Sequence, residues 1–259
     1  MKKGFVSCLL FMCLGMAGCQ QKDVEIRIIP QPQSVETTSG TYRLQKQATF
    51  TSNLPETEGK EFAEYVQASP LGLQLSTEES EKAAVQFVII APGNEHDSTE
   101  SYQLEITSKG IVVSAPSGAG LFYGFQTLLQ LADTDGTYTL PLVDIKDAPR
   151  FAYRGLHQDV SRHFRTKEFI KKQLDAMARY KLNTLHWHLT DGAGWRLEIK
   201  RYPELTEQAA YRPYPNWKAW WKGGRKYCTK DAPGADGGYY TQDDAREIVE
   251  YARQRHITV

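Results

Sequence analysis

From Pro149 to Val259 the sequence alternates between short extended runs and longer helical stretches, and this order strongly limits the possible folds. Three runs rich in apolar residues, at 151–160, 182–190 and 256–259, have the length and composition of strands. A strand–helix–strand–helix–strand order predicts a parallel sheet joined by right-handed crossovers. A doubly wound sheet and a (β/α)8 barrel both fit this pattern. Since a barrel needs about 250 residues, the segment 148–259 would hold about two and a half of its eight repeats.

Two capped helices connect the predicted strands. Thr166 is a helix N-cap residue and opens a helix that we expect to end near Tyr180. Further on, Thr241-x-x-Asp244 matches a capping box, which predicts a second helix. A long loop over residues 191–240 precedes it. The expected buried stripe of the second helix follows i, i+3, i+4 and i+7 spacing: Ala245, Ile248, Val249 and Ala252.

Residues 24–147 show a different pattern, which mixes strands and helices without regular alternation. The pattern predicts a small α+β domain, a sheet with helices packed on one side. Its polar residues are scattered, and none suggests chemistry. The expected strands are 25–29, 41–44, 84–90, 101–106, 110–115 and 141–145, and the expected helices are 56–69 and 118–132.

The first 19 residues look like a targeting segment. Lys2 and Lys3 precede a mostly apolar run at 5–16 that is too short to span a membrane. Small residues then precede Cys19, as in a bacterial lipobox. We therefore expect a lipoprotein signal peptide at 1–18, lipidation of Cys19 and a tether at 19–23. The alternative is an ordinary cleaved signal with an incidental cysteine. The expected location is outside the cytoplasm, on the periplasmic or cell-surface side, anchored by lipid.

Composition excludes several classes of partner. The 31 basic and 31 acidic residues cancel, so nothing favours nucleic acid, and membrane contact is expected through the lipid anchor alone. No cysteine spacing suggests a metal site, and we expect neither metal nor cofactor. Cys228 would be the one cysteine left unmodified in the mature chain, so no intramolecular disulfide is expected.

In an α/β barrel, functional residues lie at the carboxyl ends of the strands. This rule selects the stretches 153–163 and 186–196. His186 and His188 alternate with apolar residues, so both should lie on one face of their strand. For either histidine, a core position with satisfied hydrogen bonds is an alternative to a place in the site.

The motifs in these stretches resemble those of a known family. RGLHQDVSRHF, ARYKLNTLHWHLTDGAGWRLEIKRYPELTE and GGYYTQDDAREIVEYARQRHITV are similar to the opening of the catalytic barrel of glycoside hydrolase family 20. The preceding domain, with GLFYGFQTLLQL, is similar to the non-catalytic α+β domain of that family. The resemblance implies an exo-β-N-acetylhexosaminidase that acts on terminal β-linked GlcNAc or GalNAc of an oligosaccharide or glycoconjugate.

In that family the acetamido oxygen of the substrate is the nucleophile, and a neighbouring Asp-Glu pair assists it. The resemblance places this pair beyond Val259, so it implies no catalytic residue within these 259 residues. We therefore expect the chain alone to be an inactive, incomplete copy.

The resemblance also implies roles for three residues. Arg154 would lie at the end of the first strand and bind hydroxyls of the terminal sugar; the alternative is an arginine that pairs with a carboxylate between strands. Asp191 and His188 would support the site without touching the sugar, and Asp191 could instead be a turn residue before Gly192. The polar residues after the first strand, among them Asp159 and Arg162, are interpreted as ion pairs around the site.

The loop at 191–240 is rich in aromatic residues. Indole rings stack on the apolar faces of sugars, so Trp220 or Trp221 could line a subsite for the leaving group. Alternatively, the loop packs its aromatics against its own domain.

Two alternatives to this function remain open from the sequence. One is a non-catalytic, glycan-binding surface lipoprotein of the same fold. The other is a barrel glycosidase of a different family that uses paired carboxylates.

Overall fold

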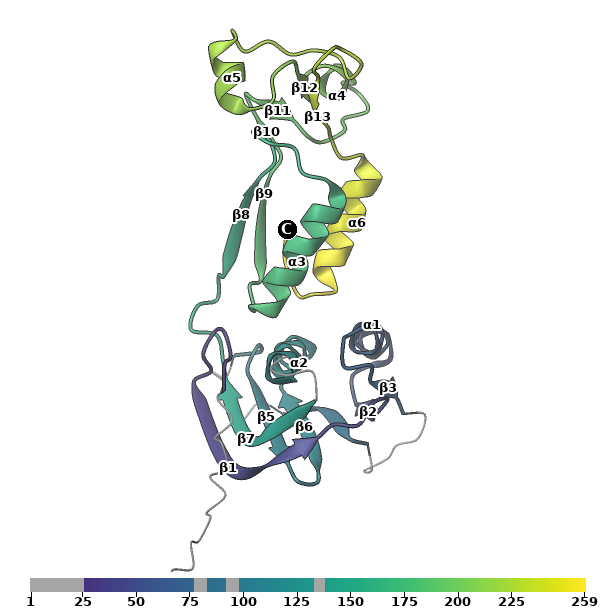
Figure 1. Ribbon diagram of the computed structural model, residues 1–259. Coiled ribbons are helices and arrows are strands. Elements are labelled where there is room, and N and C mark those ends of the chain that lie inside the picture. The colour runs from purple at the N-terminus through teal and green to yellow at the C-terminus, as the bar shows by residue number, and fades with distance from the viewer. Residues whose placement is uncertain (1–25, 77–82, 92–97, 133–137) are drawn as a thin grey trace, which may run out of the picture.

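A computed structural model describes residues 26–76, 83–91, 98–132 and 138–259 (Figure 1). The predicted signal peptide, the lipidation site Cys19 and the tether lie outside the described residues. Within the described ranges, no helix has both the length and the apolar character needed to cross a membrane.

Seven strands of the first domain form one mixed sheet in the order β1-β7-β5-β6-β4-β2-β3. Neighbours run antiparallel from β1 to β6 and parallel from β6 to β3. The helices α1 (Glu56–Gln67) and α2 (Gly118–Ala132) lie between this sheet and the second domain (Figure 1). The strands are β1 (Ser34–Arg43), β2 (Thr49–Ser52), β3 (Gln74–Leu75), β4 (Val85–Ile89), β5 (Tyr102–Thr107), β6 (Gly110–Ala115) and β7 (Thr139–Asp147).

The core of this domain follows from alternation in the strands. In β5 and β6 every second residue is buried, which gives each strand one apolar face. Helix α2 is buried almost all round, because one side packs on the sheet and the other faces the second domain. Two glycines permit this close approach: a Cβ at Gly120 would lie 2.3 Å from the Ser101 carbonyl oxygen, and one at Gly124 would lie 2.4 Å from Val113.

The second domain begins with two parallel strands, β8 (Gly155–Asp159) and β9 (Thr184–His188). Helices α3 (Lys167–Arg179) and α6 (Gln242–Arg253) pack on one side of this pair (Figure 1). Both predicted caps are present: the Thr166 hydroxyl accepts a hydrogen bond from the Phe169 amide, and Thr241 forms a capping box with Asp244. The loop between β9 and α6 holds β10 (Thr190–Asp191), β11 (Gly194–Trp195), α4 (Glu204–Glu207), β12 (Tyr211–Arg212), α5 (Trp217–Lys222) and β13 (Asp236–Gly237).

Three predictions about the fold need correction. Residues 26–29 form no strand, because the Gln130 side chain takes both the amide and the carbonyl of Ile29. The expected strand at 256–259 forms a single parallel bridge, between Thr258 and Thr184. Val249 of the predicted stripe is half exposed, while Ile248 and Ala252 are buried.

A buried polar cluster joins the two domains. The Lys181 ammonium, at the end of α3, donates to the Tyr102 hydroxyl at 2.7 Å and to the Asp147 carboxylate at 3.0 Å. Tyr102 also bonds to the Thr127 hydroxyl of α2 at 2.7 Å. Burial lowers the pKa of Lys181, although the charge of Asp147 opposes this shift. A buried charge of this kind depends on its partners, so the cluster fixes where the second domain docks.

We predict that Asp147→Ala lowers the free energy of unfolding by about 3 kcal/mol, because it leaves the Lys181 ammonium buried without its counter-charge. Lys146→Gln is the matched control. Lys146 lies 3.6 Å from Asp144 on the surface, so its loss should change stability by less than about 0.5 kcal/mol. Urea unfolding of both variants measures this, and equal effects would contradict the assigned role of the cluster.

Candidate functional site

A cluster of polar side chains lies where β8 and β9 end. The Arg162 guanidinium bridges two carboxylates: Nη1 lies 2.9 Å from Asp159 Oδ2, and Nη2 lies 2.7 Å from Asp191 Oδ2. His188 completes the cluster, with Nε2 3.4 Å from Asp191 Oδ2 and Nδ1 3.4 Å from Arg162 Nη1. All four side chains are partly exposed, so a ligand can reach them.

The backbone after β8 turns around Asp159. The amides of Ser161 and Arg162 donate to Asp159 Oδ1 at 2.9 and 3.1 Å. Burial by itself raises the pKa of Asp159, but the hydrogen bonds and charge of Arg162 outweigh it and hold the pKa below its ordinary value. Asp159 is therefore a carboxylate at neutral pH, and it fixes the orientation of Arg162.

Two buried arginines, Arg196 and Arg212, donate hydrogen bonds to the backbone carbonyls of this turn. The Arg212 guanidinium donates through Nη2 to the Arg162 carbonyl at 2.6 Å. Burial, together with nearby Arg212, lowers the pKa of Arg196 to about 10. The Arg196 guanidinium donates to carbonyls of two segments. Val160 and Ser161 lie in the turn after β8, and Ala210 and Gly238 lie in the loop between β9 and α6.

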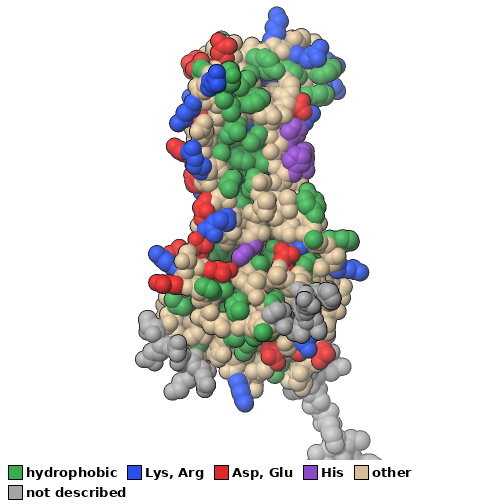
Figure 2. All heavy atoms as spheres, turned by 180° about the vertical axis from the view of Figure 1, so that it is seen from behind, with side chains coloured by type: hydrophobic (Ala, Val, Ile, Leu, Met, Phe, Trp, Pro, Cys, Tyr) green, Lys and Arg blue, Asp and Glu red, His purple; other side chains and the backbone are tan. Residues whose placement is uncertain are grey.

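Three histidines share the face of the strands that lies away from α3 and α6. The ring centroids of His157 and His186 are 4.6 Å apart, and those of His157 and His188 are 5.3 Å apart. The predicted alignment of His186 and His188 on one face is confirmed. His157 and His186 are exposed in this chain, and histidines form a surface group in Figure 2, so the core alternative for His186 stays open. The supporting roles of His188 and Asp191 stay predictions, although the structure places them side by side.

The expectation that Arg154 lies at the end of the first strand is wrong. Arg154 precedes β8, so its side chain lies at the end of the strand opposite to Asp159. Its guanidinium pairs with both carboxylate oxygens of Glu100, at 2.9 and 3.0 Å, and donates to the Lys181 carbonyl at 2.7 Å. Arg154 therefore joins the two domains, as the ion-pair alternative predicted. Arg162 follows β8 and pairs with Asp159, as expected from the sequence. The i, i+3 spacing of these two residues was the sequence signal for this contact.

Trp220 is not a subsite residue. Its side chain is only 3% exposed, and its indole nitrogen donates to the Lys226 carbonyl at 3.0 Å. Trp221 is 53% exposed and stays a candidate.

No group of three or more histidine, cysteine, aspartate or glutamate side chains in the described part of the chain is arranged to hold a metal ion. The ion pairs of Arg162 with Asp159 and Asp191 present a cation between two carboxylates, an arrangement that suits the binding of hydroxyl groups.

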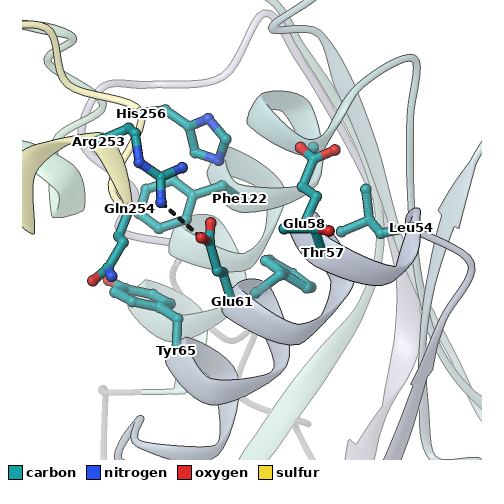
Figure 3. Close-up of a pocket in the computed structure, with 11 residues that line it drawn as sticks. Leu54, Thr57, Glu58, Glu61, Tyr65, Phe122, Arg253, Gln254 and His256 are labelled. Carbon is teal, nitrogen blue, oxygen red and sulfur yellow. Dashed lines mark hydrogen bonds and ion pairs between the residues drawn. The ribbon is translucent and has the colours of Figure 1, made fainter. Parts of the chain in front are cut away.

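A cavity of about 390 Å³ lies elsewhere, at the seam between the domains (Figure 3). Glu61 of α1 and Arg253 of α6 form an ion pair at 2.7 Å across it, and His256 packs on the Phe122 ring. Because the segment after His256 pairs with the first residue of β9, this cavity lies at the opposite end of β9 from Asp191. It is not part of the candidate site.

Comparisons with known proteins agree for both domains. Residues 151–259 match the model of the glycosyl hydrolase family 20 catalytic domain, and residues 25–148 match the model of domain 2 of that family. A β-hexosaminidase of Porphyromonas gingivalis is 34% identical over an alignment of 278 positions, gaps included, that covers 98% of this chain. An N,N'-diacetylchitobiase of Vibrio harveyi is 42% identical over 166 residues, which cover 61% of this chain and 18% of that protein.

Solved structures give the same result. A family 20 exo-β-N-acetylglucosaminidase of Vibrio harveyi in complex with N-acetylglucosamine has a TM-score of 0.72 at 31% identity. The match covers 89% of this chain and 35% of that one. A β-N-acetylhexosaminidase of Bacteroides fragilis has a TM-score of 0.71 at 29% identity and matches 90% of this chain and 44% of that one. The chain spans about a third of the length of the Porphyromonas gingivalis relative.

We predict that Arg162→Met raises the pKa of Asp159 toward its ordinary value, because the substitution removes the hydrogen bond and the charge that lower it. Carbon NMR of labelled aspartate carboxyl groups, recorded against pH, measures this. Arg154→Met is the control and should leave the titration of Asp159 unchanged, since Arg154 lies at the other end of β8. An unshifted Asp159 in Arg162→Met would contradict the site geometry.

Proposed function

The chain belongs to glycoside hydrolase family 20, and we propose that it forms part of an exo-β-N-acetylhexosaminidase that releases terminal, non-reducing β-linked GlcNAc or GalNAc from glycans. In this proposal β8, α3, β9 and α6 are the first part of a (β/α)8 barrel. The bound N-acetylglucosamine of the Vibrio harveyi structure supports the substrate class.

The observation that carries the proposal is the Arg162 guanidinium held between Asp159 and Asp191 at the carboxyl ends of two parallel strands. A planar guanidinium can donate to two adjacent oxygens at once, as neighbouring sugar hydroxyls require. The two carboxylates fix the plane of the group before substrate arrives, so less ordering is needed on binding. In this proposal Arg162 binds the sugar hydroxyls, which is the role expected of Arg154 from the family resemblance.

The proposed reaction is hydrolysis with retention of configuration. The acetamido oxygen of the substrate attacks the anomeric carbon, and the glycosidic C–O bond breaks as a carboxylic acid protonates the leaving oxygen. Water then opens the cyclic intermediate. The Asp-Glu pair for these steps belongs to an H-x-G-G-D-E type motif that the 259 residues do not contain. The residues of this chain would bind and orient the terminal sugar.

We predict that the full-length protein releases the chromophore from an aryl β-N-acetylglucosaminide but not from the aryl β-glucoside, which lacks the internal nucleophile. Arg162→Met should lower kcat/KM by about 10- to 100-fold, the effect of losing a charged hydrogen bond. Arg154→Met should instead lower the melting temperature, with a smaller change in kcat/KM. The 259-residue chain alone should be inactive.

A full-length protein that binds N-acetylglucosamine without hydrolysing any glycoside would reject this proposal and support the glycan-binding alternative. A wild-type enzyme insensitive to a thiazoline analogue of the cyclic intermediate would point to the paired-carboxylate alternative.

The proposal for location is an exported protein anchored through lipid on Cys19. Cells that express the protein should incorporate labelled fatty acid into it, and Cys19→Ser should abolish this labelling. Labelling that survives the substitution would exclude Cys19 as the anchor.

A further inference from the structure

The short helix α5 carries two exposed indole rings on one side. Asn216 caps the helix by accepting a hydrogen bond from the Ala219 amide at 2.9 Å. Trp217 and Trp221 are four residues apart, so they are neighbours on the helix surface. Their ring centroids are 5.4 Å apart with an interplanar angle of 32°, and they are 38% and 53% exposed. Exposed aromatic side chains paired in this way are unusual on a surface without a binding role.

Contacts of Trp220 and Tyr227 hold α5, and with it the two exposed indoles, against the loop next to the candidate site. Trp220, the buried residue of α5, packs against Tyr227 with ring centroids 5.9 Å apart. The Tyr227 hydroxyl donates to the Gly192 carbonyl at 2.5 Å. Gly192 directly follows Asp191, so α5 is tied to the turn that holds one carboxylate of the site. In Figure 1, α5 lies beyond the carboxyl ends of β8 and β9.

Cationic side chains surround the two indoles. Residues 217–226 contain four basic residues and no acidic residue, although the whole chain is neutral. Lys218, Lys222 and Arg225 are exposed. Arg225, three residues after the end of α5, places its guanidinium 4.6 Å from the centroid of the Trp221 ring. Basic side chains are visible at the upper end of the molecule in Figure 2, where α5 lies. Trp217, Lys218, Trp221, Lys222, Arg225 and Lys226 are called the α5 patch below.

We propose that the α5 patch binds an anionic sugar residue on the leaving-group side of the substrate, so that the preferred glycan carries a sulfate ester or a carboxylate next to its terminal N-acetylhexosamine. This inference rests on the proposed hydrolase function and names the substrate class for it. The indoles provide a surface for the apolar face of the sugar, and the basic side chains provide the counter-charge. A neutral glycan would use the rings but leave the cations unmatched. The contacts of Tyr227 with Trp220 and with the Gly192 carbonyl hold α5 next to the turn that carries Asp191.

The test compares three disaccharides in which GlcNAc is β-linked to galactose, to galactose 6-sulfate or to glucuronic acid. For the full-length wild-type protein, the KM for at least one anionic disaccharide should be about two- to fivefold below that for the neutral one, as expected for exposed charge pairs. The difference should shrink as salt rises from about 0.05 to 0.5 M, because salt screens exposed charges. Preference for one anionic disaccharide alone identifies the group as sulfate or carboxylate.

Two variants separate the parts of the patch. Lys218→Gln/Lys222→Gln should bring the ratio of anionic to neutral KM close to one. Trp221→Ala should raise KM for all three disaccharides more than for an aryl N-acetylglucosaminide. The matched control Lys60→Gln/Lys172→Gln removes two exposed charges from α1 and α3, and it should leave the ratio unchanged.

Equal KM values for the three disaccharides in an enzyme that hydrolyses the aryl substrate would overturn the inference and leave the proposed function standing. Failure to hydrolyse any substrate would overturn the proposed function instead. Calorimetry with the galactose 6-sulfate and glucuronic acid disaccharides then tests the α5 patch by itself. Binding of either one that is lost in Lys218→Gln/Lys222→Gln supports the inference, and binding that is absent for both or unaffected by the substitutions overturns it.

Discussion

The buried guanidinium of Arg196 is the interaction on which the order of the second domain depends. It donates to four backbone carbonyls, two in the turn between Asp159 and Arg162 and two in the loop between β9 and α6. A buried cation is tolerated only where hydrogen-bond acceptors replace its water. Here the four carbonyls accept the hydrogen bonds that water would otherwise accept from Arg196. The guanidinium in turn holds together two chain segments that have little regular structure of their own. The turn that presents Arg162 and the loop that presents α5 are therefore held by one group.

The two ends of β8 have different tasks. At its start Arg154 pairs with Glu100, and nearby Lys181 pairs with Asp147, so this end is fixed to the first domain. At its far end Asp159 orients Arg162 toward Asp191. Because β8 is only five residues long, the position of the end that carries Asp159 is set by how the strand is docked at its other end. This arrangement gives the first domain a physical role in placing the candidate site.

Local signals in the sequence were sufficient for some parts of the site and not for others. The alternation of β9 correctly placed His186 and His188 on one face, because a strand's side chains alternate whatever surrounds it. The role expected of Arg154 came from the resemblance alone: the predicted run 151–160 already places Arg154 nearer its start than its end, and in the structure Arg154 precedes β8. Likewise, Trp220 and Trp221 are adjacent and chemically identical in the sequence. Only the docking of α5 on its loop buries one ring and exposes the other.

The sequence by itself determined the two-domain division, the helices α1, α2, α3 and α6, the caps of α3 and α6, and the parallel pair of β8 and β9, since these depend on periodicity and on side chains within a few residues. Tertiary structure decided which residues meet. The Gln130 side chain bonds to the backbone of Ile29, where a strand was expected. Glu100 pairs with Arg154 at the end of β8 opposite to the candidate site. Asp191, from the segment after β9, pairs with Arg162. Each of these contacts joins residues at least 29 positions apart, and pairings at that distance are set by how whole elements pack, which no local pattern records.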